Sequence, residues 1–326
     1  MKDVKHWHYV VSELCNMNCT YCNVDVNNKL RLDEAYFDEF MLNLTEPFVF
    51  SIFGGEVFLQ LDIVEYIINK LESHPNLIQI VITTNGTIYN KTVKKIVEHP
   101  NIRTTISYDG IFQEAHRGNH RIYIRSLIEA GATHGHCMIN GIDMQDNILI
   151  KQHEALIDVG LVPDMTLVRD IGSWNDEQVQ TFNKEFTKYI NYLGDFKQYK
   201  TYNEIPGLIK TYLNPVLEFF MKGHEQEDCG VGTSYWAITP QKKIVACERF
   251  ERDSTTLLTN KYIVTDVCDK CDISQFCHRG CTYEQIKNKA PIAELCEIYK
   301  YINKEITELI SRTRHTLLIL FEKENM

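Results

Sequence analysis

The sequence predicts an α/β protein with a mainly parallel sheet in its first half and a cysteine-rich region near its C-terminus. Between residues 7 and 170, short β-rich runs alternate with longer amphipathic patterns, which is typical of strand-helix-strand units. The 11 cysteines fall into two groups, at residues 15 to 22 and 229 to 296, with Cys137 alone between them. A chain of 326 residues with 44% hydrophobic content can form a large core and a smaller appended domain.

Six runs rich in β-branched and aromatic residues predict the strands, at 7–13, 48–53, 78–83, 103–108, 136–140 and 164–168. Helical patterns lie between the earlier strands, at 33–44, 62–74, 90–99 and 123–132, with Asp and Asn available as N-caps. Six such units suit an open partial barrel as well as a doubly wound sheet, and periodicity alone does not choose between them.

The composition changes along the chain predict three regions. Residues 1–174 would form the α/β core, and residues 175–228 a bridge of amphipathic helices that is rich in Tyr, Phe and Lys. Residues 229–326 would form a cysteine-rich domain with a hairpin at 235–250, a loop region and a final helix from about 291 to 322.

The charge and the apolar runs argue against several classes of protein. The formal net charge of -10 does not favour a broad surface for nucleic acid or for an anionic membrane. No apolar run approaches the roughly 20 residues that span a bilayer, and the N-terminal residues lack the apolar region of a secretory signal. We therefore expect a cytoplasmic protein that binds neither nucleic acid nor membrane. Because 11 thiols in such a chain do not suit an extracellular disulfide framework, metal ligation is the leading interpretation.

The first cysteine group is the segment CNMNCTYC, in which Cys15, Cys19 and Cys22 are spaced C-x3-C-x2-C directly after the first predicted strand. At this cysteine content the spacing would arise by chance in roughly one of 80 such chains. Loops at the carboxyl ends of parallel strands are where ligands bind in α/β sheets. A structural zinc site needs four ligands, and His6 or His8 could supply the fourth. Three thiolates on a 4Fe-4S cluster would instead leave one iron open.

The segment CNMNCTYC resembles the cluster-binding loop of radical S-adenosylmethionine (radical SAM) enzymes, including the aromatic Tyr21 before the last cysteine. A second match consists of Gly54, Gly55 and Glu56 at the end of the second predicted strand, where that family carries a GGE motif. Two glycines let the backbone approach a ligand closely, and a carboxylate suits the ammonium group of a bound methionine.

This resemblance implies a partial (β/α)6 barrel, similar to a TIM barrel, whose first cluster binds S-adenosylmethionine (SAM) through its open iron. An electron from the cluster would cleave SAM to a 5'-deoxyadenosyl radical, which takes a hydrogen atom from the substrate. Asn85, Ser107 and Asn140, at later strand ends, are candidates for SAM contacts. Turn formation and strand-end hydrogen bonding explain these three residues equally well.

The second group contains CDKCDISQFCHRGC, and the whole arrangement is similar to the seven-cysteine SPASM domain of many radical SAM enzymes. Seven ligands exceed one tetrahedral zinc site and fall one short of two. The resemblance implies two auxiliary 4Fe-4S clusters and therefore three clusters in the chain. Cys229, Cys247 and Cys281 would bind the first auxiliary cluster, and Cys268, Cys271, Cys277 and Cys296 the second.

Several neighbouring residues complete this interpretation. With three thiolates, the first auxiliary cluster would have an open iron or a ligand such as Asp228 or Glu248. The SPASM pattern usually has a glycine five residues before its second cysteine, where this chain has Lys242, a departure that bears on the hairpin turn. Cys137 lies in an apolar strand and is interpreted as a core thiol. For His116 and Arg117, helix capping and salt bridging are the favoured explanation.

Radical SAM enzymes with a SPASM domain commonly oxidise, crosslink or epimerise residues of peptides or proteins. The resemblance to peptide-modifying and sulfatase-maturing members implies an oxidoreductase that acts on a peptide or protein, with a flavodoxin- or ferredoxin-type electron donor. Glu248 is the candidate general base for the departing proton. The alternative interpretation of Glu248 is a salt bridge with Arg249 or Arg252.

Two other functions stay open on the sequence. Because the first predicted strand begins near residue 7, we expect no N-terminal leader-binding domain. This leaves dehydrogenation or rearrangement of a small molecule, such as a sugar or nucleoside, as an alternative. A zinc-binding structural protein is the alternative of another class, although the GGE segment has no purpose there.

Overall fold

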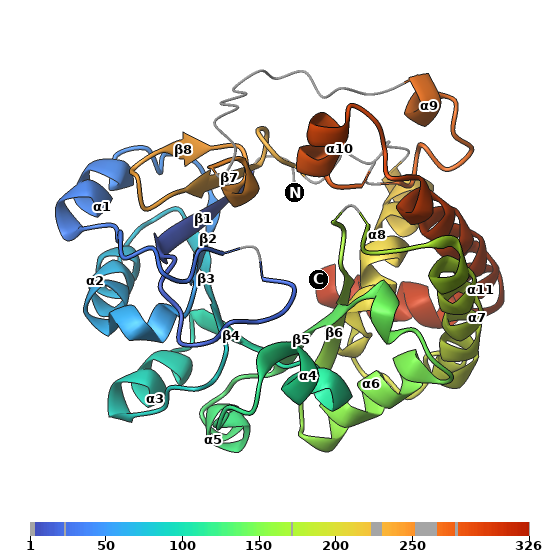
Figure 1. Cartoon of the computed structure of the whole chain (residues 1–326), viewed down its shortest axis with the longest axis horizontal. Helices are drawn as coiled ribbons and strands as arrows, with labels where there is room; N and C mark the ends of the chain where they lie inside the picture. Colours follow the sequence, from blue (N-terminus) through green and yellow to red (C-terminus); the bar gives the residue numbers. More distant parts are fainter. Residues whose placement is uncertain are drawn as a thin grey trace. The chain divides into compact units, whose positions relative to one another are not determined.

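The computed structural model describes residues 4–22, 24–170, 172–222, 230–251, 266–277 and 280–325 (Figure 1). The chain divides into two compact units, which are described separately. The first unit consists of Met1–His136, Val159–Leu161 and Gly230–Asn260, and the second of Cys137–Asp158, Val162–Cys229 and Lys261–Met326. Residues 230–260, which the composition assigned to a C-terminal domain, thus group with the first unit.

The described strands form one sheet in the order β6-β5-β4-β3-β2-β1-β7-β8. Their bounds are β1 (Lys5–Ser12), β2 (Phe48–Gly54), β3 (Leu77–Thr84), β4 (Ile102–Ser107), β5 (His134–Ile139), β6 (Val162–Leu167), β7 (Tyr235–Ile238) and β8 (Ile244–Val245). The ladders from β1 to β5 and between β1 and β7 are parallel, whereas β7 and β8 are antiparallel. All six strands predicted from the first half of the sequence are present, and the mainly parallel α/β class is confirmed.

Strands β1 to β4 alternate with helices in the first unit, as the sequence predicts. The helices are α1 (Glu34–Met41), α2 (Leu61–Leu71), α3 (Lys91–Val97), α4 (Gln113–Arg117) and α5 (Ile124–Glu129). Asp33 and Asn90 cap α1 and α3, because their side chains accept hydrogen bonds from the first turns. Figure 1 shows α1, α2 and α3 along one face of the strands.

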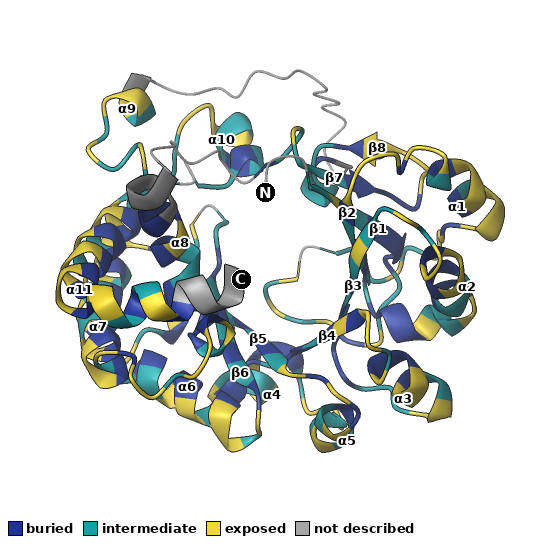
Figure 2. Cartoon of the chain, turned by 180° about the vertical axis from the view of Figure 1, so that it is seen from behind, coloured by how far each residue is buried: buried dark blue, intermediate teal, exposed yellow. Residues whose placement is uncertain are grey.

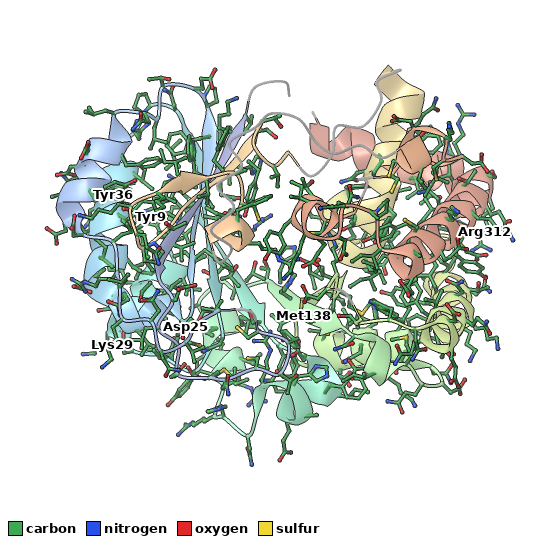
Figure 3. The ribbon with its side chains drawn as sticks, turned by 45° about the horizontal axis from the view of Figure 1, so that its top comes forward. Tyr9, Asp25, Lys29, Tyr36, Met138 and Arg312 are labelled. Carbon is green, nitrogen blue, oxygen red and sulfur yellow. The ribbon has the colours of Figure 1, made fainter. Side chains whose placement is uncertain are left out.

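An aromatic cluster joins α1 to the sheet. Tyr9 of β1 packs against Phe37 of α1, with ring centroids 5.4 Å apart, and against Phe50 of β2 at 5.5 Å. All three rings are fully buried, and Tyr9 extends from the strand toward the helix (Figure 3). The side chains of β2 alternate between buried and half-buried. One face of the strand therefore lies in the core, and the other face is half-buried.

The second unit is mostly helical outside the end of β5 and β6. Its main helices are α6 (Ile148–Asp158), α7 (Asp176–Leu193), α8 (Gly207–Lys222), α9 (Asp266–Asp269), α10 (Thr282–Asn288) and α11 (Ala293–Asn325). Figure 2 shows that α7 and α11 each have a buried side and an exposed side, as expected of amphipathic helices. Thr187 of α7 and Tyr301 of α11 share a hydrogen bond of 2.7 Å. The predicted final helix is present and runs from Ala293 to Asn325.

The predicted hairpin at 235–250 is also present, as β7 and β8. Its turn places Lys242 at a φ of 60°, in the left-handed region that favours glycine. The backbone carbonyl of Lys242 accepts a hydrogen bond from the Tyr36 hydroxyl at 3.2 Å, and its ammonium lies 2.7 Å from Asp33. These contacts from the start of α1 hold a turn that has lysine in place of the expected glycine.

Within the described ranges, no helix combines the length and the apolar character needed to cross a membrane.

Candidate active site

The cysteine loop, residues 15–22, follows the carboxyl end of β1. Backbone hydrogen bonds fold it back on itself and attach it to α4: Cys22 N donates to Cys19 O at 3.0 Å, and Thr20 N donates to His116 O at 2.9 Å. Met17 anchors the loop in the core with 4% of its surface exposed. Cys15 and Cys19 are half-buried and Cys22 is exposed. The loop therefore presents three thiols from one anchored turn.

N–H groups are directed at the sulfur atoms of Cys15 and Cys22. Cys15 Sγ accepts from Met17 N at 3.4 Å and from Asn85 Nδ2 at 3.7 Å, and Cys22 Sγ accepts from Val24 N at 3.4 Å. Such donors stabilise a ligand thiolate. Burial nevertheless raises the pKa of the Cys15 thiol, and a nearby Glu56 carboxylate adds to this rise. A positively charged metal centre would offset that cost, because metal binding displaces the thiol proton.

Cys19 lies beside a buried ion pair that the sequence did not predict as part of the site. Arg117 donates from Nε to Asp109 Oδ2 at 2.9 Å and directs Nη1 at Cys19 Sγ, 3.9 Å away. The Tyr21 hydroxyl donates to the same Asp109 oxygen at 2.5 Å. Burial raises the pKa of Cys19 to about 11, and the Arg117 charge opposes this rise. The favoured interpretation of Arg117 as a salt-bridge residue agrees with this geometry, and Asp109, in the SYDG segment, is its partner.

The GGE segment packs directly against the start of the cysteine loop. A Cβ atom on Gly54 would lie 2.2 Å from Ser12 O, and one on Gly55 would lie 2.3 Å from both Glu13 O and Leu14 O. Gly55 N donates to Ser12 O at 2.9 Å. The two glycines are thus required for contact between the end of β2 and the end of β1. This reason differs from the close approach to a ligand that the sequence suggested.

Glu56 ties the end of β2 to the end of β3. Its side chain is 1% exposed and accepts hydrogen bonds from Phe58 N at 3.0 Å, Thr84 Oγ1 at 2.8 Å and Asn85 N at 2.7 Å. Burial raises the pKa of Glu56, and these three donors oppose the rise. All three donors belong to the chain itself, so contact between Glu56 and a methionine ammonium stays a prediction.

Asn85 connects this carboxylate to the cysteine loop. Its Nδ2 donates to Asn16 Oδ1 at 2.9 Å, and its Oδ1 accepts from Thr87 N at 3.0 Å and Thr87 Oγ1 at 2.7 Å. Asn16 Nδ2 in turn donates to Thr87 Oγ1 at 2.8 Å. Asn16 and Thr87 were missed in the sequence, where the only signal was an asparagine inside the cysteine segment and the TTNGT turn after β3.

The two remaining candidates for SAM contacts lie at later strand ends. Ser107 is 9% exposed at the end of β4, where its backbone pairs with His136. Asn140 lies in the second unit and caps a short 3-10 helix, Gly141–Asp143, in a reciprocal capping box with Asp143. The turn-forming explanation therefore describes what the Asn140 side chain does here. SAM contacts of both residues stay predictions.

Glu248 lies in a cluster with aromatic and sulfur neighbours in the first unit. Its Oε2 accepts from the Tyr235 hydroxyl at 2.8 Å, and Cys247 Sγ lies 3.5 Å from the same oxygen. The His8 ring packs against Tyr235, with centroids 4.5 Å apart, and burial lowers the pKa of His8. Of the two arginines proposed as salt-bridge partners of Glu248, Arg252 lies outside the described residues.

Five cysteines of the second group line a single pocket in the second unit: Cys268, Cys271, Cys277, Cys281 and Cys296. Burial, together with the thiols of Cys277, Cys268 and Cys271, raises the pKa of Cys296 to about 11. Cys229 and Asp228 fall outside the described residues, and Cys247 belongs to the first unit. Among the described residues, no three His, Cys, Asp or Glu side chains are close enough to hold one metal ion.

The thiols of the cysteine loop and the N–H groups directed at Cys15 and Cys22 fit an iron-sulfur cluster. Soft thiols with N–H groups directed at their sulfur atoms are the ligands that such clusters use. His6 and His8, the other possible ligands at the first site, lie within β1, where His8 packs against Tyr235.

Comparison with known proteins is consistent with this interpretation of the fold and cysteine loop. Residues 9–140 match the model of the Radical SAM superfamily. An uncharacterized protein of Methanocaldococcus jannaschii is 29% identical over 113 residues, which are 33% of this chain and 40% of that protein. The chain thus aligns with less than half of this relative.

Two solved structures share the fold. The structure of anSMEcpe with bound AdoMet and Cp18Cys peptide has a TM-score of 0.73 at 16% identity, covering 96% of this chain and 99% of that one. Streptococcus suis SuiB bound to the precursor peptide SuiA has a TM-score of 0.58 at 15% identity, covering 88% of this chain and 74% of SuiB. At these identities the likeness concerns the fold, and the predicted fold class is confirmed.

The parallel strands and the anchored three-thiol loop define an α/β protein with a group of free thiols after the end of its first strand. Over residues 9–140, the match to the Radical SAM superfamily confirms the resemblance stated from the sequence for the cysteine loop and the GGE segment.

Proposed function

We propose that this protein is a radical SAM enzyme that modifies a peptide or protein substrate oxidatively. One observation carries the proposal: hydrogen bonds through Glu56 and Asn85 hold the Cys15 end of the three-thiol loop against the ends of β2 and β3. The fold is similar over nearly the whole chain to a protein that binds AdoMet and a peptide. It is also similar to one that binds a precursor peptide. Both likenesses support a peptide substrate.

Ten cysteines would hold three 4Fe-4S clusters in this proposal. Cys15, Cys19 and Cys22 would bind the first, and the seven cysteines of the second group would bind two auxiliary clusters in the sets given by the SPASM resemblance. With SAM bound, the first cluster supplies the electron that generates a hydrogen-abstracting radical. The chain's own contribution is to fix the loop through Asn85 and Glu56 and to keep the thiols of Cys15 and Cys19 half-buried.

Glu248 would serve as the base in an oxidative reaction. A carboxylate can take a substrate proton only if it is held within hydrogen-bonding reach. The Tyr235 hydroxyl fixes one Glu248 oxygen at 2.8 Å, and the carboxylate would accept the proton. The adjacent Cys247 would bind the first auxiliary cluster, so that base and electron acceptor would lie side by side in sequence.

We further propose the cytoplasm as the compartment, because thiols that bind clusters need reducing surroundings. A flavodoxin- or ferredoxin-type protein would supply the electrons. Nucleic acid and membrane have no role in the proposal, in agreement with the net charge of -10.

The first test replaces Cys15, Cys19 and Cys22 together by alanine. Reconstituted under anaerobic conditions, the wild-type protein should contain about 12 irons and form 5'-deoxyadenosine from SAM with reductant. The triple variant should contain about 8 irons and form none. Cys137→Ala, which removes a buried thiol of β5, is the control. It should have the same iron content as the wild type and form the same amount of 5'-deoxyadenosine. If the wild-type protein binds zinc and forms no deoxyadenosine, the proposal of a radical SAM enzyme is wrong.

A second test concerns Glu248→Gln, assayed with a library of short peptides containing Cys and Ser. The wild type should yield peptides that have lost two hydrogens, as detected by mass spectrometry. The variant should still form deoxyadenosine but lose at least about 100-fold in oxidised peptide, since general-base catalysis typically contributes 10²–10⁴-fold. Equal oxidised peptide from both proteins would exclude Glu248 as the base. Turnover of sugars or nucleosides in place of peptides would favour a small-molecule substrate.

A further inference from the structure

The guanidinium of Arg117 lies between a carboxylate and a thiol in the interior of the first unit. Its Nε donates to Asp109 Oδ2 at 2.9 Å, and its Nη1 faces Cys19 Sγ at 3.9 Å. Arg117 is 8% exposed and Asp109 is 0% exposed. A buried cation therefore faces a thiol of the cysteine loop.

Several contacts fix the Arg117 side chain in this position. The Tyr21 hydroxyl donates to Asp109 Oδ2 at 2.5 Å, and the Tyr21 ring lies 5.5 Å from the guanidinium carbon. Thr20 N, next to Cys19, donates to the backbone carbonyl of His116 at 2.9 Å. The cysteine loop and the arginine are therefore tied together through both backbone and side chains. A planar guanidinium suits this arrangement because its N–H groups point in fixed directions, one toward Asp109 and one toward Cys19.

We propose that Arg117 is a positioning residue that directs positive charge at Cys19 and makes the first cluster easier to reduce. This role rests on the proposed function, in which Cys15, Cys19 and Cys22 bind that cluster. Reduction adds one electron to the cluster and breaks no bond, so the reduced cluster is the more negative state. An N–H donor and a positive charge at a ligand sulfur stabilise the more negative state and raise the reduction potential.

Asp109 offsets only part of this effect, because the Arg117 charge lowers the pKa of Cys19 more than the Asp109 charge raises it. Asp109 binds the Nε edge of the guanidinium and leaves Nη1 directed at sulfur. Because the site is buried, the charge is weakly screened, and a contact at this distance acts strongly on the cluster. Arg117 would thus set how readily the reductant can transfer to the first cluster the electron that SAM cleavage requires.

The test is the reduction potential of the first cluster in the full-length holoenzyme, measured by redox titration with dithionite and electron paramagnetic resonance. The first cluster is identified as the signal that changes when SAM is added. In Arg117→Gln the ratio of reduced to oxidised cluster at a fixed potential should fall about tenfold, which corresponds to about 59 mV for one electron. Arg117→Lys keeps the positive charge but not the planar guanidinium. Its reduction potential should lie between those of Arg117→Gln and the wild type.

Arg121→Gln is the matched control, because Arg121 is an exposed arginine four residues away that packs over the Tyr123 ring. Its potential should equal that of the wild type. An unchanged potential in Arg117→Gln, or an equal shift in Arg121→Gln, would overturn the role of Arg117. If Arg117→Gln retains no first cluster, Arg117→Lys decides: a lowered potential supports the role and a wild-type potential overturns it. If the wild-type protein has no electron paramagnetic resonance signal that changes when SAM is added, the proposed function is wrong. The proposed role of Arg117 is then wrong as well.

Discussion

A Gly55→Ala variant is expected to lose about 3 kcal/mol or more of folding free energy, together with the iron of the first cluster. The added Cβ would lie 2.3 Å from the carbonyl oxygens of Glu13 and Leu14. Both atoms belong to the backbone, which cannot turn aside as a flexible side chain would. Glu56 N, which donates to Leu14 O at 2.9 Å, would lose its partner as the strands separate. Such a loss is a large fraction of the roughly 5–15 kcal/mol that typically stabilises a protein.

Denaturant unfolding and iron analysis measure the two effects. Gly194→Ala is the control, because Gly194 has a φ of 65° and a Cβ added there would meet no heavy atom within 4 Å. Strain of the left-handed backbone alone should cost Gly194→Ala about 1 to 2 kcal/mol, without loss of iron at the first site. If Gly55→Ala costs no more than Gly194→Ala and keeps its iron, the close packing of the GGE segment on β1 is not what holds the cysteine loop.

The motifs of the first site could be recognised from the sequence, but their physical roles could not. Glu56 accepts hydrogen bonds from Thr84 and Asn85, which lie 28 and 29 residues away, at and just after the end of the next strand. That contact depends on the register of β2 against β3, which no local pattern encodes. The sequence therefore indicated that Glu56 belongs to the site but suggested a ligand for its carboxylate, where the chain supplies its own donors.

Asp109 and Arg117 illustrate a different reason. His116 and Arg117 were singled out in the sequence but Asp109 was not, and the arginine reaches Cys19 only because α4 packs its backbone against the cysteine loop. The two residues of that contact are separated by 98 positions. Periodicity predicts which side of an element is buried, whereas the identity of a partner across the core follows from how the elements are packed.

The turn at Lys242 shows how a departure from a motif can be tolerated. A left-handed residue other than glycine costs about 1 to 2 kcal/mol. The hydrogen bond from Tyr36 offsets about 0.5–1.5 kcal/mol of that cost, and the exposed ion pair with Asp33 adds to this offset. Both partners lie around the first turn of α1, more than 200 residues earlier in the chain. The sequence alone could not reveal this compensation.

Replacement of Cys296 by alanine is expected to remove one auxiliary cluster, so that the iron content falls from about 12 to about 8 per chain. Cys296 lines the same pocket as four other cysteines of the second group, and its thiol is half-buried. The second auxiliary cluster is assigned four thiolates, and loss of one of them should release this cluster during anaerobic desalting. SAM cleavage at Cys15, Cys19 and Cys22 should continue, which separates this loss from a general failure to fold.

Double variants then reveal which thiols share a cluster. The SPASM resemblance assigns Cys277 and Cys296 to one cluster and Cys281 to the other, although all three line one pocket. The Cys277→Ala and Cys296→Ala pair should therefore lose about four irons, no more than either single variant, because one cluster is lost once. The Cys281→Ala and Cys296→Ala pair should lose about eight, because two clusters are lost. A loss of only four irons from the second pair would assign Cys281 to the same cluster as Cys296, and the interleaved ligation would be wrong.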